Sequence, residues 1–183
     1  MRIKELVYAA LFAALIAVLA LIPPVSLGFI PVPITAQTLG VMLAGCFLGW
    51  RMGALSLVIF LILIAIGLPV LPGGRGGLAI LAGPTAGYLL SWPLAAGLIG
   101  WCTEAVWPKV RAWKLFVISL IFGVLLVNLI GASCMAWITN TPVWAGLTGS
   151  AAFLPGDLIK ALLAAVITMQ LKPLSPLEDK RRG

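Results

Sequence analysis

Three charged side chains lie in stretches that are otherwise apolar or glycine-rich, and they are the residues best suited to chemistry. Asp157 and Lys160 lie in a hydrophobic run near the C-terminus, and Arg75 lies in a glycine tract. A charged side chain near the centre of a bilayer costs at least ~2.5–3.5 kcal/mol unless it faces protein, water or a partner. Each of the three therefore needs a structural or a functional reason.

The three-residue spacing of Asp157 and Lys160 puts both on one face of a helix. One interpretation is structural: a mutual ion pair inside a bundle, or an aspartate that favours the dipole of a helix starting at Pro155. The functional interpretation is an outward-facing pocket. There Lys160 meets an anionic group, and Asp157 accepts hydrogen bonds from N–H donors.

Neutral polar groups and glycines predicted at the same membrane face complete this pocket. Arg75 alone could be an ordinary loop arginine in water, but the glycines beside it let the backbone approach a ligand closely. A proline-stiffened stretch, 30–33, precedes several neutral donors and acceptors, and Tyr88 and Trp92 offer aromatic walls. We expect a small, amphipathic, anionic ligand. The predicted contacts besides Asp157 and Lys160 are Thr35, Gln37, Gly73, Gly74, Arg75 and Tyr88, with Thr38 close by.

The composition excludes a soluble domain and most metal or acid–base chemistry. Of 183 residues, 62% are hydrophobic and 9% charged, whereas soluble domains carry about a quarter charged residues. The chain has no histidine, and its three cysteines form no CxxC pair. It also lacks the GxxxxGK[ST] nucleotide motif. We therefore expect no metal, no cofactor and no enzymatic activity.

Prolines, glycines and isolated charges divide the chain into six predicted transmembrane helices. A spanning helix needs about 20 mainly apolar residues, so little of the chain is left over. The sequence predicts an all-α membrane protein whose residues 1–183 form a single transmembrane domain. The spans are approximately 5–22, 36–50, 53–68, 81–106, 115–138 and 151–171.

The basic residues predict the orientation, because short cytoplasmic loops retain Lys and Arg during insertion. Arg75 alone falls on one face, and Lys160 falls within a span. Both termini are therefore predicted to be cytoplasmic. The net charge of +7 then reflects topology and attraction to anionic lipid, and nucleic acid is not expected as a partner. The basic residues on the cytoplasmic face are Arg2, Lys4, Arg51, Lys109, Arg111, Lys114, Lys172, Lys180, Arg181 and Arg182.

Small residues recur every four positions in the first span. Ala9 and Ala13 form one such stripe, and Ala10 and Ala14 form another. Such stripes let a second helix approach closely. The second helix can belong to the same bundle or to a separate membrane subunit.

Four separated motifs give the chain a family resemblance. It resembles the BioY family, the biotin-specific substrate-binding (S) components of energy-coupling factor (ECF) transporters, over essentially its whole length. The motifs are Pro-Ile-Thr-Ala-Gln-Thr at 33–38, Gly-Gly-Arg-Gly-Gly at 73–77, Gly-Pro-Thr-Ala-Gly-Tyr at 83–88 and Leu-Pro-Gly-Asp-Leu-Ile-Lys at 154–160.

The resemblance implies a six-helix S component in a bacterial cell membrane that captures biotin with high affinity at the outer face for uptake. In that family a transmembrane coupling protein and two ABC-type ATPase subunits supply the energy. Asp157 and Lys160 match the last-helix pocket of the family, and the alanine stripes match its AxxxA docking feature. Biotin would then place its ureido group at Asp157 and its carboxylate or carbonyl at Lys160 and Arg75.

Two other classes of function remain open from the residues alone. The chain could be an S component for a different small vitamin. It could also be a proton-coupled carrier or an intramembrane enzyme, in which Asp157 and Lys160 relay protons. The shortage of further polar groups disfavours catalysis, and a purely structural scaffold would leave the buried charges unexplained.

Overall fold

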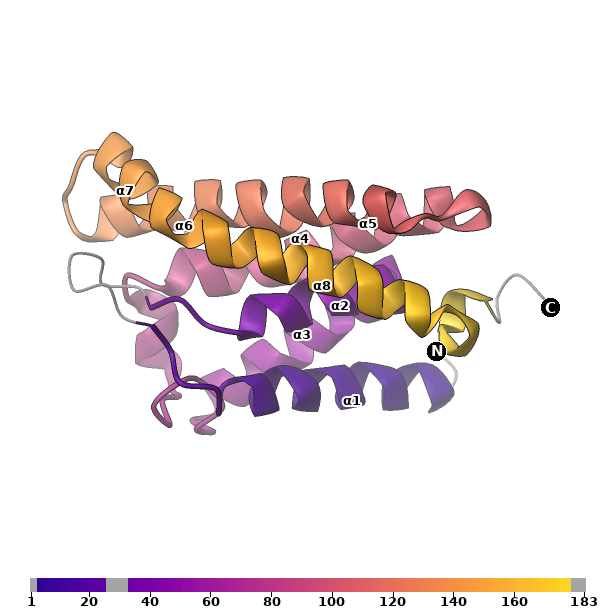
Figure 1. Cartoon of the computed structure of the whole chain (residues 1–183). Helices are drawn as coiled ribbons and strands as arrows, with labels where there is room; N and C mark the ends of the chain where they lie inside the picture. The colour runs from indigo at the N-terminus through magenta and orange to yellow at the C-terminus, as the bar shows by residue number, and fades with distance from the viewer. Residues whose placement is uncertain (1–2, 26–32, 179–183) are drawn as a thin grey trace.

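The computed structural model describes residues 3–25 and 33–178 and is helical throughout (Figure 1). Within these ranges it contains no β-strand, only two isolated bridges, Val25 with Ile34 and Leu71 with Arg75. Short 3₁₀ turns and one π-helical segment, η3, interrupt or extend the α-helices. The elements are α1 (Ile3–Leu19), α2 (Gln37–Leu48), α3 (Trp50–Ala65), η1 (Leu78–Ala82), α4 (Ala86–Val106), η2 (Trp107–Lys109), α5 (Ala112–Ile118), η3 (Ser119–Leu126), α6 (Val127–Ile138), α7 (Val143–Ser150), η4 (Ala151–Phe153), α8 (Leu154–Gln170) and η5 (Lys172–Leu174).

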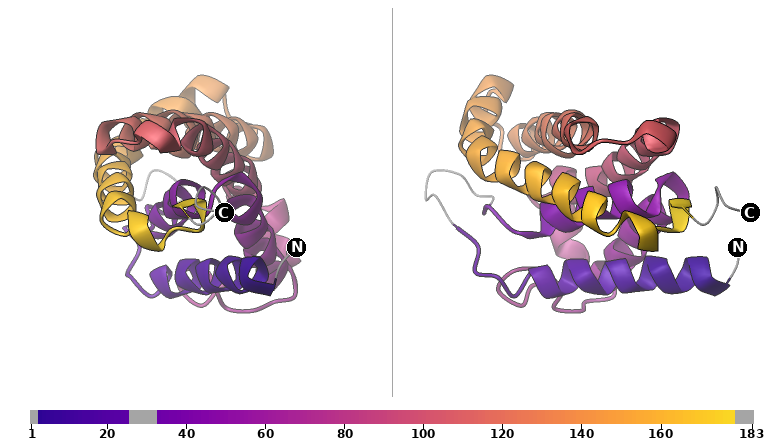
Figure 2. Two further views of the ribbon diagram at one scale, coloured as in Figure 1. Left: turned by 90° about the vertical axis from the view of Figure 1, so that its right-hand side faces the viewer. Right: turned by 45° about the vertical axis from the view of Figure 1, so that its right-hand side comes forward.

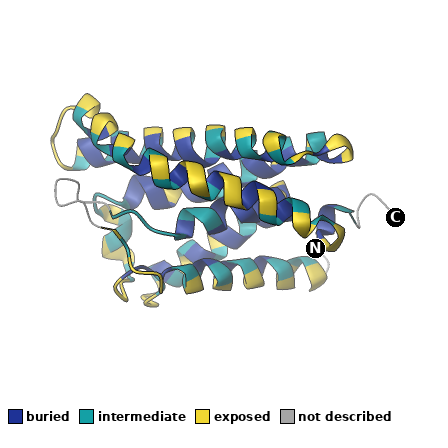
Figure 3. Ribbon diagram, in the orientation of Figure 1, coloured by how far each residue is buried: buried dark blue, intermediate teal, exposed yellow. Residues whose placement is uncertain are grey.

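Three helices among the described residues are long and apolar enough to cross a membrane. They are Ala86–Lys109, Ala112–Ile138 and Val143–Gln170, which have 24, 27 and 28 residues. Their outward faces, and that of α1, carry exposed large apolar side chains such as Leu11, Leu125 and Leu162 (Figure 3). This pattern is the reverse of a soluble bundle and fits a protein surrounded by hydrocarbon.

The shortest predicted span, α2, lies at the centre of the bundle. Its 12 residues extend only about 18 Å at 1.5 Å per residue. It packs against α1, α3, α4 and α8, and the end-on view shows it enclosed by its neighbours (Figure 2, left). Gly45 allows this close packing, because a Cβ there would lie 2.7 Å from Ile99 on α4. The enclosed helix need not match the full bilayer thickness.

The helix boundaries differ from the predicted spans at several places. The fourth helix begins at Ala86 and not at 81, because residues 78–82 form the separate turn η1. Only Gly49, with φ +81°, separates α2 from α3, so the third span starts at Trp50 and not at 53. The last span starts at Val143 and not at 151, because α7 and η4 run directly into α8. The predicted spans left residues 139–150 outside any helix, but packing of α7 on α6 stabilises 143–150 as a helix.

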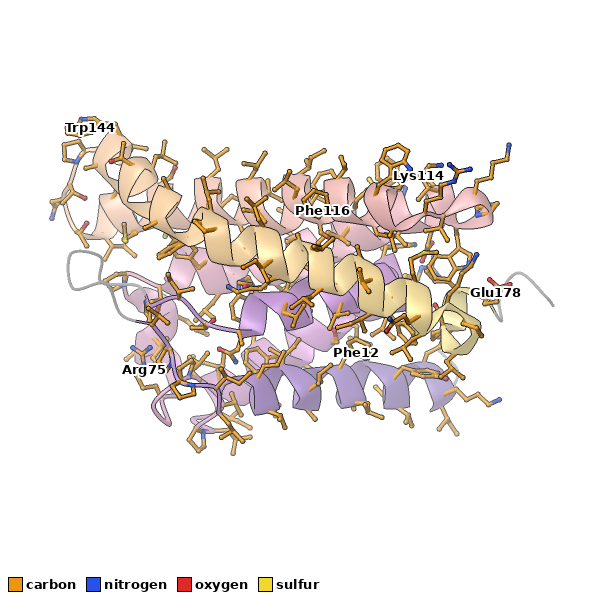
Figure 4. The ribbon with its side chains drawn as sticks, viewed as in Figure 1. Phe12, Arg75, Lys114, Phe116, Trp144 and Glu178 are labelled. Atoms are coloured by element: carbon orange, nitrogen blue, oxygen red, sulfur yellow. The ribbon has the colours of Figure 1, made fainter. Side chains whose placement is uncertain are left out.

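The two ends of the bundle differ in charge. The described termini lie at one end, with Lys114 and Glu178, whereas Arg75 lies at the other (Figures 1 and 4). At the terminal end three cations lie over tryptophan rings: Arg51 over Trp50, Lys114 over Trp113 and Lys172 over Trp107. Tryptophan with basic residues is typical of a membrane–water interface. Of the basic residues used to predict orientation, Arg2, Lys180, Arg181 and Arg182 lie outside the described residues.

The C-terminal segment folds back onto this end of the bundle. The Ser175 hydroxyl is fully buried and donates to the Phe47 carbonyl at 2.7 Å. The indole N–H of Trp107 donates to Glu178 at 3.1 Å. These contacts hold the end of α2 and the turn after α4 together, away from the charged residues of α8.

Candidate functional site

A cavity opens at the end of the bundle opposite the termini, and it contains both charged residues of α8. Its empty volume is about 690 Å³ when the open space at its mouth is included. Segments distant in the sequence converge on it, from the start of α2 to the first turn of α8. Its lining is Pro33, Ile34, Thr35, Gln37, Thr38, Leu71, Pro72, Arg75, Ile80, Thr85, Tyr88, Leu89, Trp92, Gly123, Val127, Asn128, Phe153, Asp157 and Lys160.

A hydrogen-bonded network of charged and polar groups crosses one side of the cavity. The Lys160 ammonium donates to Asp157 Oδ1 at 2.9 Å and to the Thr38 hydroxyl at 3.0 Å. Asn128 donates its side-chain N–H groups to the other Asp157 oxygen at 3.4 Å and to the Val124 carbonyl at 3.0 Å. The network therefore joins α2, α6 and α8 around one ion pair.

The local sequence explains how α8 presents this pair. Pro155 lies in the first turn, where its missing N–H removes no helical bond, and Asp157 also lies in that turn. The carboxylate is thus favoured by the helix dipole and by Lys160 three residues on. The two side chains form the ion pair of the structural interpretation, and they also line the cavity.

The ion pair keeps unused hydrogen-bonding capacity that a ligand can meet. A lysine ammonium has three donors and Lys160 uses two on protein atoms. Each Asp157 oxygen accepts one protein hydrogen bond and can accept another. The Asp157 and Lys160 side chains are only 8% and 14% exposed, so a ligand bond here forms largely away from water.

Two aromatic side chains form an apolar wall with polar edges. Tyr88 packs edge-on against Phe153, with ring centroids 6.2 Å apart, and Trp92 stacks on Phe60 at 5.9 Å. The Tyr88 hydroxyl and the Trp92 indole N–H are buried and have no hydrogen-bond partner among the described residues. Buried donors are almost always paired, so each of these two groups can donate to a ligand acceptor that reaches it.

A glycine on α6 sets the position of the Tyr88 ring. A Cβ at Gly131 would overlap the ring atoms of Tyr88. Any larger residue at 131 would push the ring toward the cavity or separate α4 from α6. The space available to a ligand therefore depends on the absence of a side chain at 131.

Arg75 lies at the mouth of the cavity. It is exposed, and its Nε donates to the Pro72 carbonyl at 3.1 Å, which holds the side chain beside its own loop. Gly73 and Gly74 are exposed and are not among the residues that line the cavity, so their contact with a ligand stays a prediction. Their φ angles of +76° and +69° favour glycine. They shape the turn that carries Leu71, Pro72 and Arg75.

The other sequence-predicted contacts all lie at the cavity: Thr35, Gln37, Arg75, Tyr88, Asp157 and Lys160. The residues predicted from the sequence did not include Asn128, although a lone amide in a span often forms an interhelical hydrogen bond. The structure shows that bond and also places Asn128 in the cavity lining. The available signal was an amide in an otherwise apolar span. Of the predicted loop 30–33, residues 30–32 lie outside the described residues, and Pro33 lines the cavity.

The two alanine stripes of α1 differ in exposure. Ala9 and Ala13 are buried against the bundle, so packing within this chain accounts for them and they are not available to a partner. Ala10 and Ala14 are exposed, among apolar residues such as Leu6, Val7 and Leu11. Only this second stripe can take part in docking as α1 is placed.

Comparison with known proteins identifies the family of the chain. A sequence model of the BioY family matches residues 1–176. The chain belongs to the BioY family. It is 48% identical over 172 residues to the biotin transporter BioY of Rhizobium etli, covering 91% of this chain and 92% of the relative. It is 41% identical over 179 residues to the probable biotin transporter BioY of Bacillus subtilis, covering 98% and 96%.

A solved structure also matches the fold of the chain. The chain is similar to the S component for biotin of an ECF-type ABC transporter, with a TM-score of 0.89 and 39% identity, over 93% of this chain and 92% of that one. The predicted all-α membrane fold of S-component type is confirmed, as is the resemblance carried by the four motifs. BioY proteins are transporters, so the chain belongs to a family of carriers and not of enzymes.

Proposed function

We propose that this chain is the substrate-capture subunit of an ECF-type vitamin importer and that it binds biotin in the cavity around Asp157 and Lys160. The observation that carries the proposal is the buried ion pair, which lines the cavity and keeps free donor and acceptor sites. The names of the relatives supply the ligand: they are called biotin transporters, and the matched structure is an S component for biotin.

The chemistry of biotin suits the arrangement of groups in the cavity. Its ureido ring has two N–H donors and a carbonyl, which complement Asp157 and the free N–H of Lys160. Its apolar thiophane ring suits the wall formed by Trp92 and Phe153. Its carboxylate, which favours water, suits the mouth near Arg75. A carboxylate next to Asp157 would be repelled, which favours this orientation over the reverse.

Orientation in the membrane follows from the same asymmetry. The basic, tryptophan-rich end with the described termini suits the cytoplasmic interface, and the end with Arg75 and the cavity suits the outer face. The cavity then captures ligand from outside a bacterial cell. The membrane is the cell membrane, where an importer of this class acts.

Uptake against a gradient needs energy, and this chain carries no nucleotide-binding motif. A transmembrane coupling protein and two ABC-type ATPases are the partners we propose. The exposed face of α1 around Ala10 and Ala14 is the docking surface we propose for the coupling protein, because small residues there let another helix approach closely.

Titration calorimetry of the purified protein with a panel of water-soluble vitamins tests the proposal. Biotin should bind tightly and the other vitamins should not. Asp157→Asn and Lys160→Ala should each weaken biotin binding in protein that remains folded. Unchanged affinity in both variants would overturn the site, and tight binding of a different vitamin would leave the fold assignment but replace the ligand.

A further inference from the structure

We infer that Gln37 is a positioning residue that links the ligand cavity to the outer end of α1 and to the loop between α3 and η1. A ligand held beside Gln37 then stabilises both segments together. The inference rests on the proposed binding of biotin in this cavity, and it assigns Gln37 a role different from that of a simple ligand contact.

Gln37 completes the hydrogen bonding at the end of α1. A helix leaves its last four carbonyls without intrahelical partners. Three of them are satisfied by the following turn: the carbonyls of residues 17, 18 and 19 accept from the N–H groups of residues 20, 21 and 22. The fourth, that of Ile16, accepts from Gln37 Nε2 at 3.1 Å, across 21 residues of chain. Gln37 is therefore a C-terminal cap for α1 supplied by another helix.

The same nitrogen also holds the loop that follows α3. Gln37 Nε2 donates its second N–H to the Val70 carbonyl at 3.1 Å. Val70 immediately precedes the turn of residues 71–75, which places Leu71, Pro72 and Arg75 around the cavity. One amide group thus connects α1, α2 and this loop.

The partners fix which way the amide faces. Both neighbours of the nitrogen are carbonyl oxygens, which only accept, so the NH₂ group must point to them. Its two donors are then used. The remaining polar atom, Oε1, has no hydrogen-bond partner among the described residues. Gln37 is 99% buried yet lines the cavity, so Oε1 is the atom that can accept a hydrogen bond from a ligand N–H.

Tight packing couples the first turn of α2 to α1. A Cβ added at Gly40 would lie 2.6 Å from Ile16 Cγ1, so the two helices touch one turn beyond Gln37. A shift of Gln37 therefore cannot occur without breaking the cap or moving the end of α1. An occupied cavity that restrains Oε1 restrains Ile16 and Val70 as well.

Hydrogen–deuterium exchange on the wild-type chain tests this link without any substitution. Saturating biotin should slow exchange at least several-fold at residues 20–22 and also at residues 70–74. Residues 112–118 of α5, at the opposite end of the bundle, should not change. Protection of the loop with no change at the end of α1 in biotin-bound protein would overturn the inference.

A conservative variant with a neighbouring control sharpens the test. Gln37→Glu keeps Oε1 and the side-chain length but cannot make both donations, because a carboxylate has no donor and a carboxylic acid has only one. Even without ligand it should speed exchange at residues 20–22, and with saturating biotin it should lose the joint protection of both segments. The control is Thr38→Val, because Thr38 contacts Lys160 in the cavity and has no hydrogen bond to α1 or to the loop. It should weaken biotin binding but retain both protected segments once saturated.

The outcomes separate this inference from the proposed function. If Gln37→Glu shows the wild-type exchange pattern with and without biotin, the link through Gln37 is wrong although biotin binding stands. If calorimetry detects no biotin binding to folded wild-type protein, the proposed function fails. Exchange at residues 20–22 in ligand-free Gln37→Glu then still tests the cap itself. If this exchange is no faster than in the wild type, the result counts against the inference.

Discussion

Removing the ammonium of Lys160 while keeping its length, as Lys160→Met, should destabilise the protein and abolish tight binding. Lys160 lies 2.9 Å from Asp157, whose side chain is 8% exposed. Breaking a buried pair from one side costs ~3–5 kcal/mol, because it leaves an uncompensated buried charge. Because the pair borders a cavity that water can enter, we expect Lys160→Met to lower the free energy of unfolding by about 2–3 kcal/mol, at or below the lower end of that range.

Equilibrium unfolding in mixed micelles measures this loss, and calorimetry measures biotin binding. Loss of one partner of a buried charge pair costs at least about 2 kcal/mol in binding, or roughly 30-fold in affinity. The double variant Asp157→Asn with Lys160→Met removes both charges and should recover to within about 1 kcal/mol of wild-type stability without recovering biotin binding. If the double variant is no more stable than Lys160→Met, the ion-pair reasoning is refuted.

Three further predictions concern the cavity wall, its mouth and the opposite end of the bundle. Gly131→Ala should weaken biotin binding about tenfold or more, because the added methyl displaces the Tyr88 ring. The control Gly97→Ala should bind biotin as the wild type does, because an added Cβ there makes only an ordinary contact. Equal biotin affinities of the two variants in calorimetry would contradict this prediction. Arg75→Gln should weaken biotin binding up to about fivefold and leave binding of biotin amide unchanged, and an equal loss for both ligands contradicts a carboxylate contact. Ser175→Ala should lower unfolding stability by about 1–2 kcal/mol, because a buried carbonyl at the end of α2 loses its donor, and calorimetry should show unchanged biotin affinity.

The sequence predicted the charged part of the site because membrane insertion makes intramembrane charge rare. Asp157 and Lys160 stood out for that reason alone, and their i,i+3 spacing placed both on one helical face. Their partners could not be found in the same way. Thr38 and Asn128 lie far from Asp157 in the chain, and only the packing of α2, α6 and α8 brings them together.

Local conformation limited the prediction elsewhere. The glycines at 73 and 74 predicted a backbone close to ligand, and the sequence could not show that their positive φ angles also shape the turn. The predicted spans left residues 139–150 outside any helix, and contact with α6 makes 143–150 helical. The four-residue spacing of alanines in α1 could not say which stripe faces outward, because both stripes have the same composition.

The retention of biotin by purified wild-type protein tests the central claim most directly. Mass spectrometry of folded, monodisperse protein from cells grown with biotin should detect one biotin per chain, and protein carrying Asp157→Asn with Lys160→Met should contain none. Folded wild-type protein that carries no biotin, and that takes up none when it is added, would contradict the account.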